Sequence, residues 1–326
     1  MPFEIIPSGT HIDFISRRRV CIVISLLMIA AGAAAVFARG GVPMGIDFTG
    51  GTELQLLFDE GVAVDDSRLR TVVAEAGIES ATVVRFGAEG TNEYLVKFPG
   101  GLDDDDGGQA KSPAEGAGAE VSGQGDRIAR LGQVIREQIG GFTQQRVEFV
   151  GPRVGEELRE DGAQALLLSA IAILIYIAFR FSSRYAPGAI VAVVHDLSIT
   201  AGILVILGIE FDLRILAAML AILGYSLNDT IIIYDRIREN LELRTTADLE
   251  QVLNTSVNQT LSRTVLTSAT TVIALLALFV LGGDVIRPFA LAMLIGVFVG
   301  TYSSVFIAAP ILLFLERRYG EAAKPA

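Results

Sequence analysis

The fold is decided by Leu223–Asn240, which reads LGYSLNDTIIIYDRIREN. Up to Tyr234 this stretch is mostly apolar, and it carries one carboxylate, Asp229, before it ends in a charged run. An apolar helix of this kind with basic residues at one end is typical of a membrane span. The stretch therefore predicts a membrane protein with an acidic side chain inside one of its helices.

The rest of the chain is predicted to cross the membrane as well. Of its 326 residues 51% are hydrophobic and its mean hydropathy is +0.51, which is too apolar for a soluble domain. A span needs roughly 20 mostly apolar residues. Six segments qualify, near residues 20–38, 163–179, 187–207, 214–234, 264–282 and 289–315. We expect an α-helical polytopic membrane protein, with transmembrane helix 1 in 1–38, five helices in 162–318 and a tail in 319–326.

Arginines indicate the orientation of these spans. They cluster before span 1, between spans 2 and 3, after span 4 and after span 6, which is one side of the membrane if every segment crosses. They are Arg17, Arg18, Arg19, Arg180, Arg184, Arg236, Arg238, Arg244, Arg317 and Arg318. Basic loops stay in the cytoplasm, so both termini are expected there, in a cell inner membrane.

Span 1 has a second interpretation. Its basic start, apolar stretch and Val36-Phe37-Ala38 resemble a cleavable signal peptide. The apolar stretch is long enough to span, so we expect a retained anchor. The single cysteine, Cys21, lies in this run, which excludes a disulfide framework and a cysteine metal site.

Residues 39–161 are predicted to form an acidic periplasmic domain between spans 1 and 2. They hold 23 acidic and 12 basic residues, whereas the rest of the chain has 14 of each. Periodicity and turn signals predict strands at 52–58, 81–86, 93–98 and 144–150, and helices at 65–76 and 126–139. This βαββαβ order is that of a ferredoxin-like α+β unit. The acidic excess argues against nucleic acid as a partner, because a phosphate backbone needs a basic face.

Residues 100–125 are a low-complexity acidic insert in this domain. They contain Asp103–Asp106 and many glycines but little apolar surface to offset ordering entropy, so we expect disorder. Calcium is the alternative for the four aspartates. Calcium loops alternate carboxylates with turn residues and add a distant Glu, a pattern that this run lacks. No metal or cofactor is predicted.

A glycine-rich run, Gly45-Ile46-Asp47-Phe48-Thr49-Gly50-Gly51-Thr52, follows span 1. It marks a tight turn between the span and the first strand. Phosphate binding is a poor alternative, because neither a Lys nor a following helix accompanies the glycines.

Ionisable groups inside spans are expensive and indicate function. Asp229 lies six residues before Asp235, roughly 9 Å below the cytoplasmic edge of span 4. An unpaired carboxylate there favours its protonated form and can exchange a proton. Arg263, at the start of span 5, is either a surface anchor or the partner of Asp229 in a protonation-dependent switch.

His195 and Asp196 lie near the middle of span 3. Adjacent helical residues point about 100° apart, so only one of them can face a given neighbour squarely. Asp196 is expected to bond to Ser, Thr or Asn groups of neighbouring helices. Its role is left open between structural contact and proton pathway.

Small residues predict close helix packing around these groups. They recur on span 4 at Ala217, Ala221, Gly224 and Asn228, and on span 6 at Gly296, Gly300 and Ser304. On the cytoplasmic side, Thr245 and Asp248 form a capping pair for an amphipathic helix over 245–262, with an apolar face at Leu249, Leu253, Val257 and Leu261. No catalytic constellation is present, so an enzyme is not expected.

Several of these runs resemble the SecF branch of the SecD/SecF protein-export family. They are Gly224–Thr230 with Asp235–Asn240, the run Gly45–Thr52, Val194-His195-Asp196, Gln259–Thr264 and Gly282-Gly283. The acidic insert departs from the family. The resemblance implies half of a transporter of the resistance-nodulation-division superfamily, with SecD as the other half. Gly45, Asp47, Gly50, Gly51, Asp235 and Arg236 belong to its motifs.

The resemblance also implies a function. Such proteins act with SecD, the SecYEG channel, SecA and YajC, and use the proton-motive force to promote preprotein export. The proton path would include Asp229, Arg263 and Asn228, with Asp196 as a weaker member. The partners would be these proteins, unfolded preprotein and membrane lipids.

Two other functions stay open. A half-sized lipid or drug exporter of the same superfamily would usually have a larger outer domain. A passive scaffold of the channel would tolerate neutralisation of its buried charges. Coupling to sodium in place of protons is also compatible with the sequence.

Overall fold

The computed structural model describes residues 7, 10–78, 81–87, 91–98, 128–181, 185–243 and 248–319. Within them the chain forms two compact units, one built from the segments up to Pro43 and from Gly162 onward, the other from Met44–Asp161. The predicted insert 100–125 and the predicted cap residue Thr245 lie outside the described residues.

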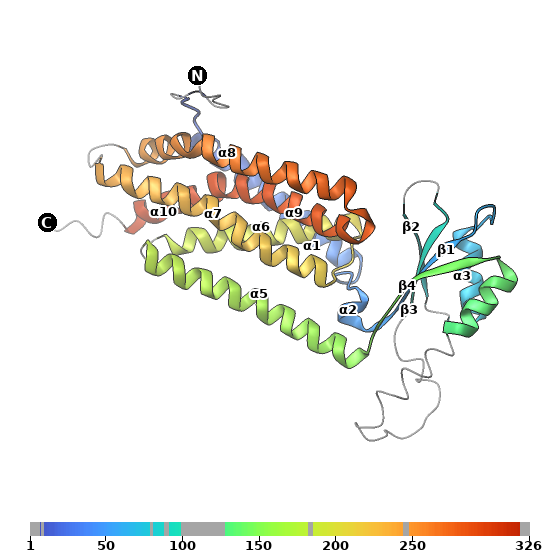
Figure 1. Ribbon diagram of the computed structural model, residues 1–326. Helices are drawn as coiled ribbons and strands as arrows, with labels where there is room; N and C mark the ends of the chain where they lie inside the picture. The colour runs from blue at the N-terminus through green and yellow to red at the C-terminus, as the bar shows by residue number, and fades with distance from the viewer. Residues whose placement is uncertain are drawn as a thin grey trace. The chain divides into compact units, whose positions relative to one another are not determined.

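The first unit is a bundle of long helices (Figure 1). In the described residues, six helices are long and apolar enough to cross a membrane. After a short 3-10 turn at Ile15–Arg17 they are α1 (Arg18–Ala38), α5 (Pro152–Arg180), α6 (Ala186–Leu207), α7 (Leu213–Leu243), α8 (Leu249–Leu281) and α9 (Gly283–Ser303), which continues through the π-helix η2 (Ser304–Ala308) into α10 (Ala309–Tyr319).

The inner helices of the bundle are α6, α7 and α9, whereas only 11% of the most apolar stretch of each of α1, α5 and α8 is buried. Glycines bring the inner helices together. A Cβ on Gly296 would meet Ile222 of α7 at 2.3 Å, and one on Gly300 would meet Ser226 at 2.9 Å. The predicted packing role of these span 6 glycines is thus visible in atomic contacts.

One helix differs from its prediction. The sequence predicts a separate amphipathic helix over 245–262, but the structure has one continuous helix, α8, which begins at Leu249. Asp248 precedes it in an extended conformation and makes no side-chain capping bond. Residues 249–281 contain neither Gly nor Pro, so nothing interrupts the backbone hydrogen bonds between the surface part and the span.

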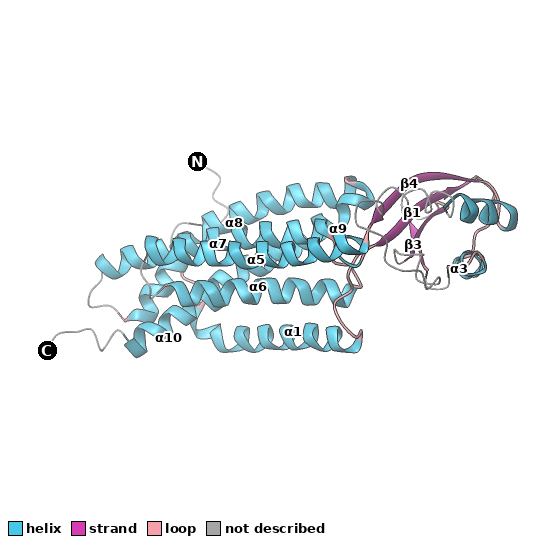
Figure 2. Cartoon of the chain, turned by 90° about the horizontal axis from the view of Figure 1, so that it is seen from below, coloured by secondary structure: helices cyan, strands magenta, loops and turns pink. Residues whose placement is uncertain are grey.

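The second unit is a four-stranded antiparallel sheet with helices on one face (Figure 2). Its elements are β1 (Gly51–Phe58), α3 (Asp66–Glu75), β2 (Thr82–Phe86), β3 (Glu93–Phe98), a helix over residues 128–138, and β4 (Phe142–Val150). The strand order β2-β3-β1-β4 is that of the predicted ferredoxin-like fold.

Alternation of side chains explains this layer structure. Leu54, Leu56 and Phe58 of β1 point to one face, and they pack against Leu69 of α3 and Leu131 of the 128–138 helix. The fully buried Tyr94 of β3 donates its hydroxyl to the Val64 carbonyl at 3.0 Å. One apolar face therefore makes the core of this unit.

Candidate functional site

The first buried acid, Asp196, lies in the middle of α6 with 1% of its surface exposed. Its Oδ2 accepts hydrogen bonds from the hydroxyls of Ser226 on α7 and Ser303 on α9, the latter at 2.8 Å. The expected serine partners are therefore present. Asp196 joins the three inner helices at one point.

His195 contacts the same acid, although adjacent positions on a helix predict that the two side chains diverge. Its Nδ1 lies 2.8 Å from Asp196 Oδ1, and its Nε2 lies 2.9 Å from Ser25 Oγ of α1. The imidazole also stacks on the Tyr302 ring, with centroids 6.1 Å apart. Adjacent positions diverge at the Cα, but the two side chains are long enough to meet. The sequence feature that could indicate this contact is Ser25, a polar residue within the apolar span 1.

A second hydroxyl pair continues along α7. Thr230 donates to the Ser226 carbonyl at 3.4 Å and lies 3.0 Å from the Ser304 hydroxyl. Ser304 begins the π-helix η2, where the backbone ladder is locally widened. Buried polar groups thus extend from Asp196 to Thr230, the neighbour of Asp229.

Asp229 is the second buried acid, with 2% of its surface exposed. No hydrogen-bond partner among the described residues reaches its Oδ2, which is itself buried. An unpartnered carboxylate oxygen in a membrane bundle is costly and indicates a functional group.

Arg263 is a charged group that acts on Asp229. The two groups interact through space, but they do not form an ion pair within 4.0 Å. Arg263 is exposed on α8, whereas its neighbour Thr264 is buried. The structure therefore brings the two predicted partners near each other without closing the contact.

Asn228 does not join this group. It is exposed, on the outer face of α7, together with Ala217, Ala221 and Gly224. The predicted small-residue face of span 4 thus points away from the bundle, and a Cβ on Gly224 would meet no atom within 4 Å.

The glycine run holds the start of β1 against the start of α5. Residues Ile46–Thr49 form the short helix α2, where the sequence predicted only a turn, and Gly45 precedes it. Gly50 has φ +71°, and a Cβ there would lie 2.7 Å from Pro152 Cα. Asp47 is in the first turn of α2. The run is a close backbone junction.

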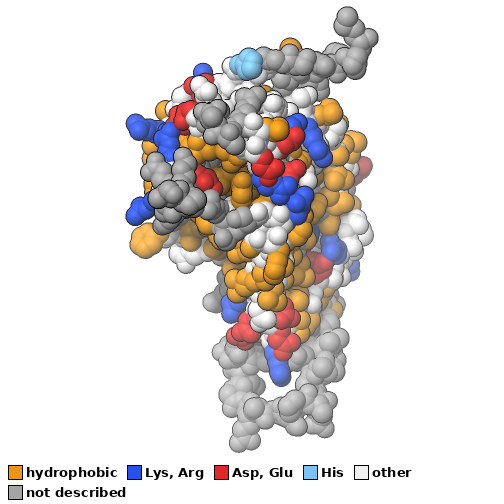
Figure 3. Space-filling model, turned by 90° about the vertical axis from the view of Figure 1, so that its left-hand side faces the viewer, with side chains coloured by type: hydrophobic (Ala, Val, Ile, Leu, Met, Phe, Trp, Pro, Cys, Tyr) orange, Lys and Arg blue, Asp and Glu red, His pale blue; other side chains and the backbone are white. Residues whose placement is uncertain are grey.

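The basic end of the bundle is where α1 begins, α7 ends, α8 begins and α10 ends. Asp235 pairs with Arg238 at 3.3 Å and with Arg180 of α5 at 3.9 Å, and Arg236 pairs with Glu239 at 2.8 Å. Glu250 bridges Arg18 at 2.9 Å and Arg317 at 3.0 Å. Acidic and basic side chains mix on this end (Figure 3).

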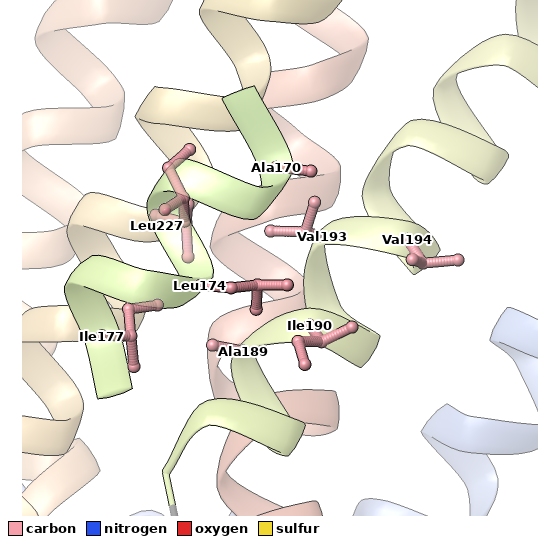
Figure 4. A pocket seen from close by; sticks show the side chains of 9 residues that line it. Ala170, Leu174, Ile177, Ala189, Ile190, Val193, Val194 and Leu227 are labelled. Carbon is pink, nitrogen blue, oxygen red and sulfur yellow. The ribbon is translucent and has the colours of Figure 1, made fainter. Parts of the chain in front are cut away.

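An apolar pocket of about 40 Å³ lies between α5, α6 and α7. Its lining side chains are all aliphatic (Figure 4), among them Leu174, Val193 and Leu227. Such walls offer no group to carry a proton or to bind an ion. In the described part of the chain, no three His, Cys, Asp or Glu side chains gather as a metal ion would require.

Two family models match the chain. The C-terminal model of protein export membrane protein SecD/SecF matches residues 132–318, and the SecD/SecF GG motif model matches residues 36–62, which include Gly50 and Gly51. The protein translocase subunit SecF of Magnetococcus marinus is 41% identical, with 96% of this chain and 94% of the relative covered. SecF of Vibrio alginolyticus is 39% identical over 96% and 92%.

Longer relatives contain this chain as one part. The protein translocase subunit SecDF of Thermus thermophilus is 38% identical and covers 96% of this chain, which spans 40% of that protein. A crystal structure of the same SecDF, described as a translocon-associated membrane protein, superposes with a TM-score of 0.80 at 37% identity, covering 95% and 39%.

The fold and the site define a class: a six-span membrane protein with a ferredoxin-like domain after span 1 and two buried acids among its inner helices. The chain belongs to the SecD/SecF family of protein-export membrane proteins, and its full-length relatives are SecF subunits of the protein translocase. A multi-pass membrane location follows, and the lipid or drug exporter is not favoured.

Proposed function

We propose that this chain works with SecD to couple the proton-motive force to late export of preproteins through SecYEG, after SecA has acted. Asp229 is the proton acceptor, and its protonation weakens its attraction to Arg263. The observation that carries this proposal is the buried, unpartnered Asp229 Oδ2 beside a charge that it does not touch. Such a pair can close or open as the proton comes and goes.

The outer face of α7 supports SecD as the missing half. Asn228 and Arg263 both expose polar groups on helices that would otherwise face hydrocarbon. The small residues of this face let another helix approach closely. Because SecDF of Thermus thermophilus contains a region like this chain as 40% of its length, a SecD half packed here would enclose the proton path.

The orientation follows from charge. The basic end of the bundle lies in the cytoplasm of the cell, with both termini, and Met44–Asp161 lies in the periplasm, where it meets emerging polypeptide. YajC is a further partner. The protein has no chemical reaction to catalyse, and its energy comes from the ion gradient.

Export into vesicles tests the proposal. Vesicles with SecYEG, SecA, SecD and this chain receive a preprotein under an imposed proton gradient. Asp229→Asn should abolish the stimulation by the gradient, because an amide cannot exchange the proton. Glu242→Gln removes an exposed charge from the same helix and should have no effect.

Co-purification with SecD shows that the variant complex assembles. Full stimulation with Asp229→Asn in an assembled complex would reject the proton switch. A sodium gradient imposed in parallel identifies the coupling ion.

A further inference from the structure

A chain of four hydrogen bonds runs from Asp196 on α6 to the backbone of α1. Asp196 Oδ1 lies 2.8 Å from His195 Nδ1, and His195 Nε2 lies 2.9 Å from Ser25 Oγ. Ser25 Oγ lies 3.1 Å from the Tyr302 hydroxyl, which donates to the Cys21 carbonyl at 2.7 Å. His195, Asp196 and Ser25 are each at most 5% exposed, whereas Tyr302 and Cys21 are half-buried.

The donor of each of these four hydrogen bonds can be assigned by starting at the Cys21 carbonyl. A carbonyl only accepts, so the single proton of Tyr302 is used on Cys21. The bond between Ser25 and Tyr302 must then be donated by Ser25, whose only proton is used in turn. His195 Nε2 therefore carries a hydrogen and donates it to Ser25.

At the near end, two arrangements satisfy the bond to Asp196. Either Nδ1 also carries a hydrogen and donates to an ionised Asp196, or a protonated Asp196 donates to a bare Nδ1. Both hold one proton more than an ionised Asp196 beside a neutral imidazole. We infer that the His195–Asp196 pair is a second proton-binding site in the membrane and is loaded in this conformation.

Release of this proton changes the contact with α1. The remaining hydrogen stays on Nδ1, which faces the ionised Asp196, and Nε2 becomes an acceptor. Ser25 must then turn its proton to Nε2. The Tyr302 hydroxyl has one proton and can donate it either to Ser25 or to the Cys21 carbonyl, so one of these two bonds is lost. Ser25 and Gly32 are the buried residues of α1, so release of the proton weakens one of the two buried contacts of this helix.

The surroundings of the pair contain few other titratable groups. Tyr302 comes from α9 and Cys21 from α1, while α7 contributes Ser226 and, three residues later, Asp229. The π-helix η2 holds no titratable side chain, and its Ser304 hydroxyl lies 3.0 Å from that of Thr230. The basic side chains of α10, Arg317 and Arg318, lie in the last turn of that helix. The excess proton is thus held by His195 and Asp196 themselves.

The use of this proton rests on the proposed proton-driven function, but its presence can be measured without export. The chain has two histidines, so His11→Gln leaves His195 as the only imidazole. Nitrogen-15 NMR of the full chain in lipid, with labelled histidine, reports which ring nitrogens carry hydrogen. Infrared spectroscopy with Asp196→Asn as reference reports a protonated carboxyl group.

We expect either an imidazolium, or a hydrogen on Nε2 with a protonated Asp196, at neutral pH. Ser25→Ala or Tyr302→Phe should lower the pH of proton loss by about one unit, a tenfold loss of proton affinity, because one hydrogen bond of the loaded chain is gone. Tyr302→Phe keeps the inference testable if Ser25→Ala does not fold.

Tyr225→Phe is the matched control, because the Tyr225 hydroxyl has no hydrogen-bond partner among the described residues. It should leave the proton loss at its original pH. A neutral imidazole with its hydrogen on Nδ1 between pH 5 and pH 9, unchanged by Ser25→Ala and Tyr302→Phe, would overturn the inference. If spectroscopy shows the proton on the His195–Asp196 pair but export does not respond to the proton gradient, the proposed function is rejected and this inference stands.

Discussion

At the scale of single residues, Gly50 shows why the glycine run has its composition. Its φ of +71° and ψ of 155° lie in a region that is essentially restricted to glycine. Its missing side chain also leaves room for the backbone of Pro152, and a Cβ on Gly155 would meet the Gly50 nitrogen at 2.7 Å. Conformation and contact therefore demand glycine for separate reasons.

Gly50→Ala is expected to destabilise the Met44–Asp161 unit by about 3 kcal/mol, from backbone strain plus overlap with Pro152. Gly61 is the matched control, because its φ is +95° but no atom lies within 4 Å of a Cβ there. Gly61→Ala should cost only the strain, roughly 1 kcal/mol. Thermal unfolding of the intact protein measures both, and equal losses would show that the contact with Pro152 contributes nothing.

Residue patterns alone revealed the buried acids but not all of their partners. Asp196 and Asp229 stand out because a carboxylate in an apolar run has no local explanation. Ser25 could not be assigned to His195, since the two are 170 positions apart and local periodicity does not say which helices are neighbours. The outward position of Asn228 was missed for the same reason.

At the scale of elements, α8 joins the surface and the membrane. The predicted apolar face is present, since Leu253 and Val257 are buried. The polar face of α8 also makes contacts that the sequence does not predict. Asn258 bonds to both backbone groups of Ile12, and Asn254 accepts from the Phe14 amide at 2.9 Å. Two asparagines one turn apart thus hold the segment before α1, which a sequence pattern for amphipathicity does not report.

The double change Asn254→Ala and Asn258→Ala should release this segment. The Ile12 and Phe14 amides each lose an acceptor, so their hydrogen exchange should accelerate about tenfold. Gln251→Ala, an exposed residue of the same helix, is the control and should leave both rates unchanged. Unchanged protection in the double variant would mean that other contacts hold the segment.

Acid should loosen the same segment. The Ser16 amide, the Ser16 hydroxyl and Asn254 hold the pKa of Asp13 below its ordinary value of 3.8. A carboxylate whose pKa is lowered by folding stabilises the folded form above its ordinary pKa and loses that effect as the pH falls through the lowered value. The original protein should therefore protect this segment from hydrogen exchange better than the Asp13→Asn variant does, and the two should become equal only in strong acid.

At the scale of the whole molecule, two glycines distinguish contacts within the chain from contacts with another chain. Gly32 of α1 crosses Gly202 of α6, where a Cβ would lie 2.7 Å from the Gly202 Cα. Gly224 lies on the outer face of α7 with open space around it. Gly32 is needed for packing within this chain, and in our proposal Gly224 is needed for packing against SecD.

Leucine at these two positions should therefore give opposite results. Gly32→Leu forces α1 away from α6 and should lower the thermal stability of the purified chain, because the obstacle is backbone. Gly224→Leu should leave that stability within about 0.5 kcal/mol of the original, as expected for an exposed position without contacts, but should reduce the amount of SecD that co-purifies. Co-purification at the original level with Gly224→Leu would place SecD on another face, and loss of stability in both variants would show that α7 has no free face.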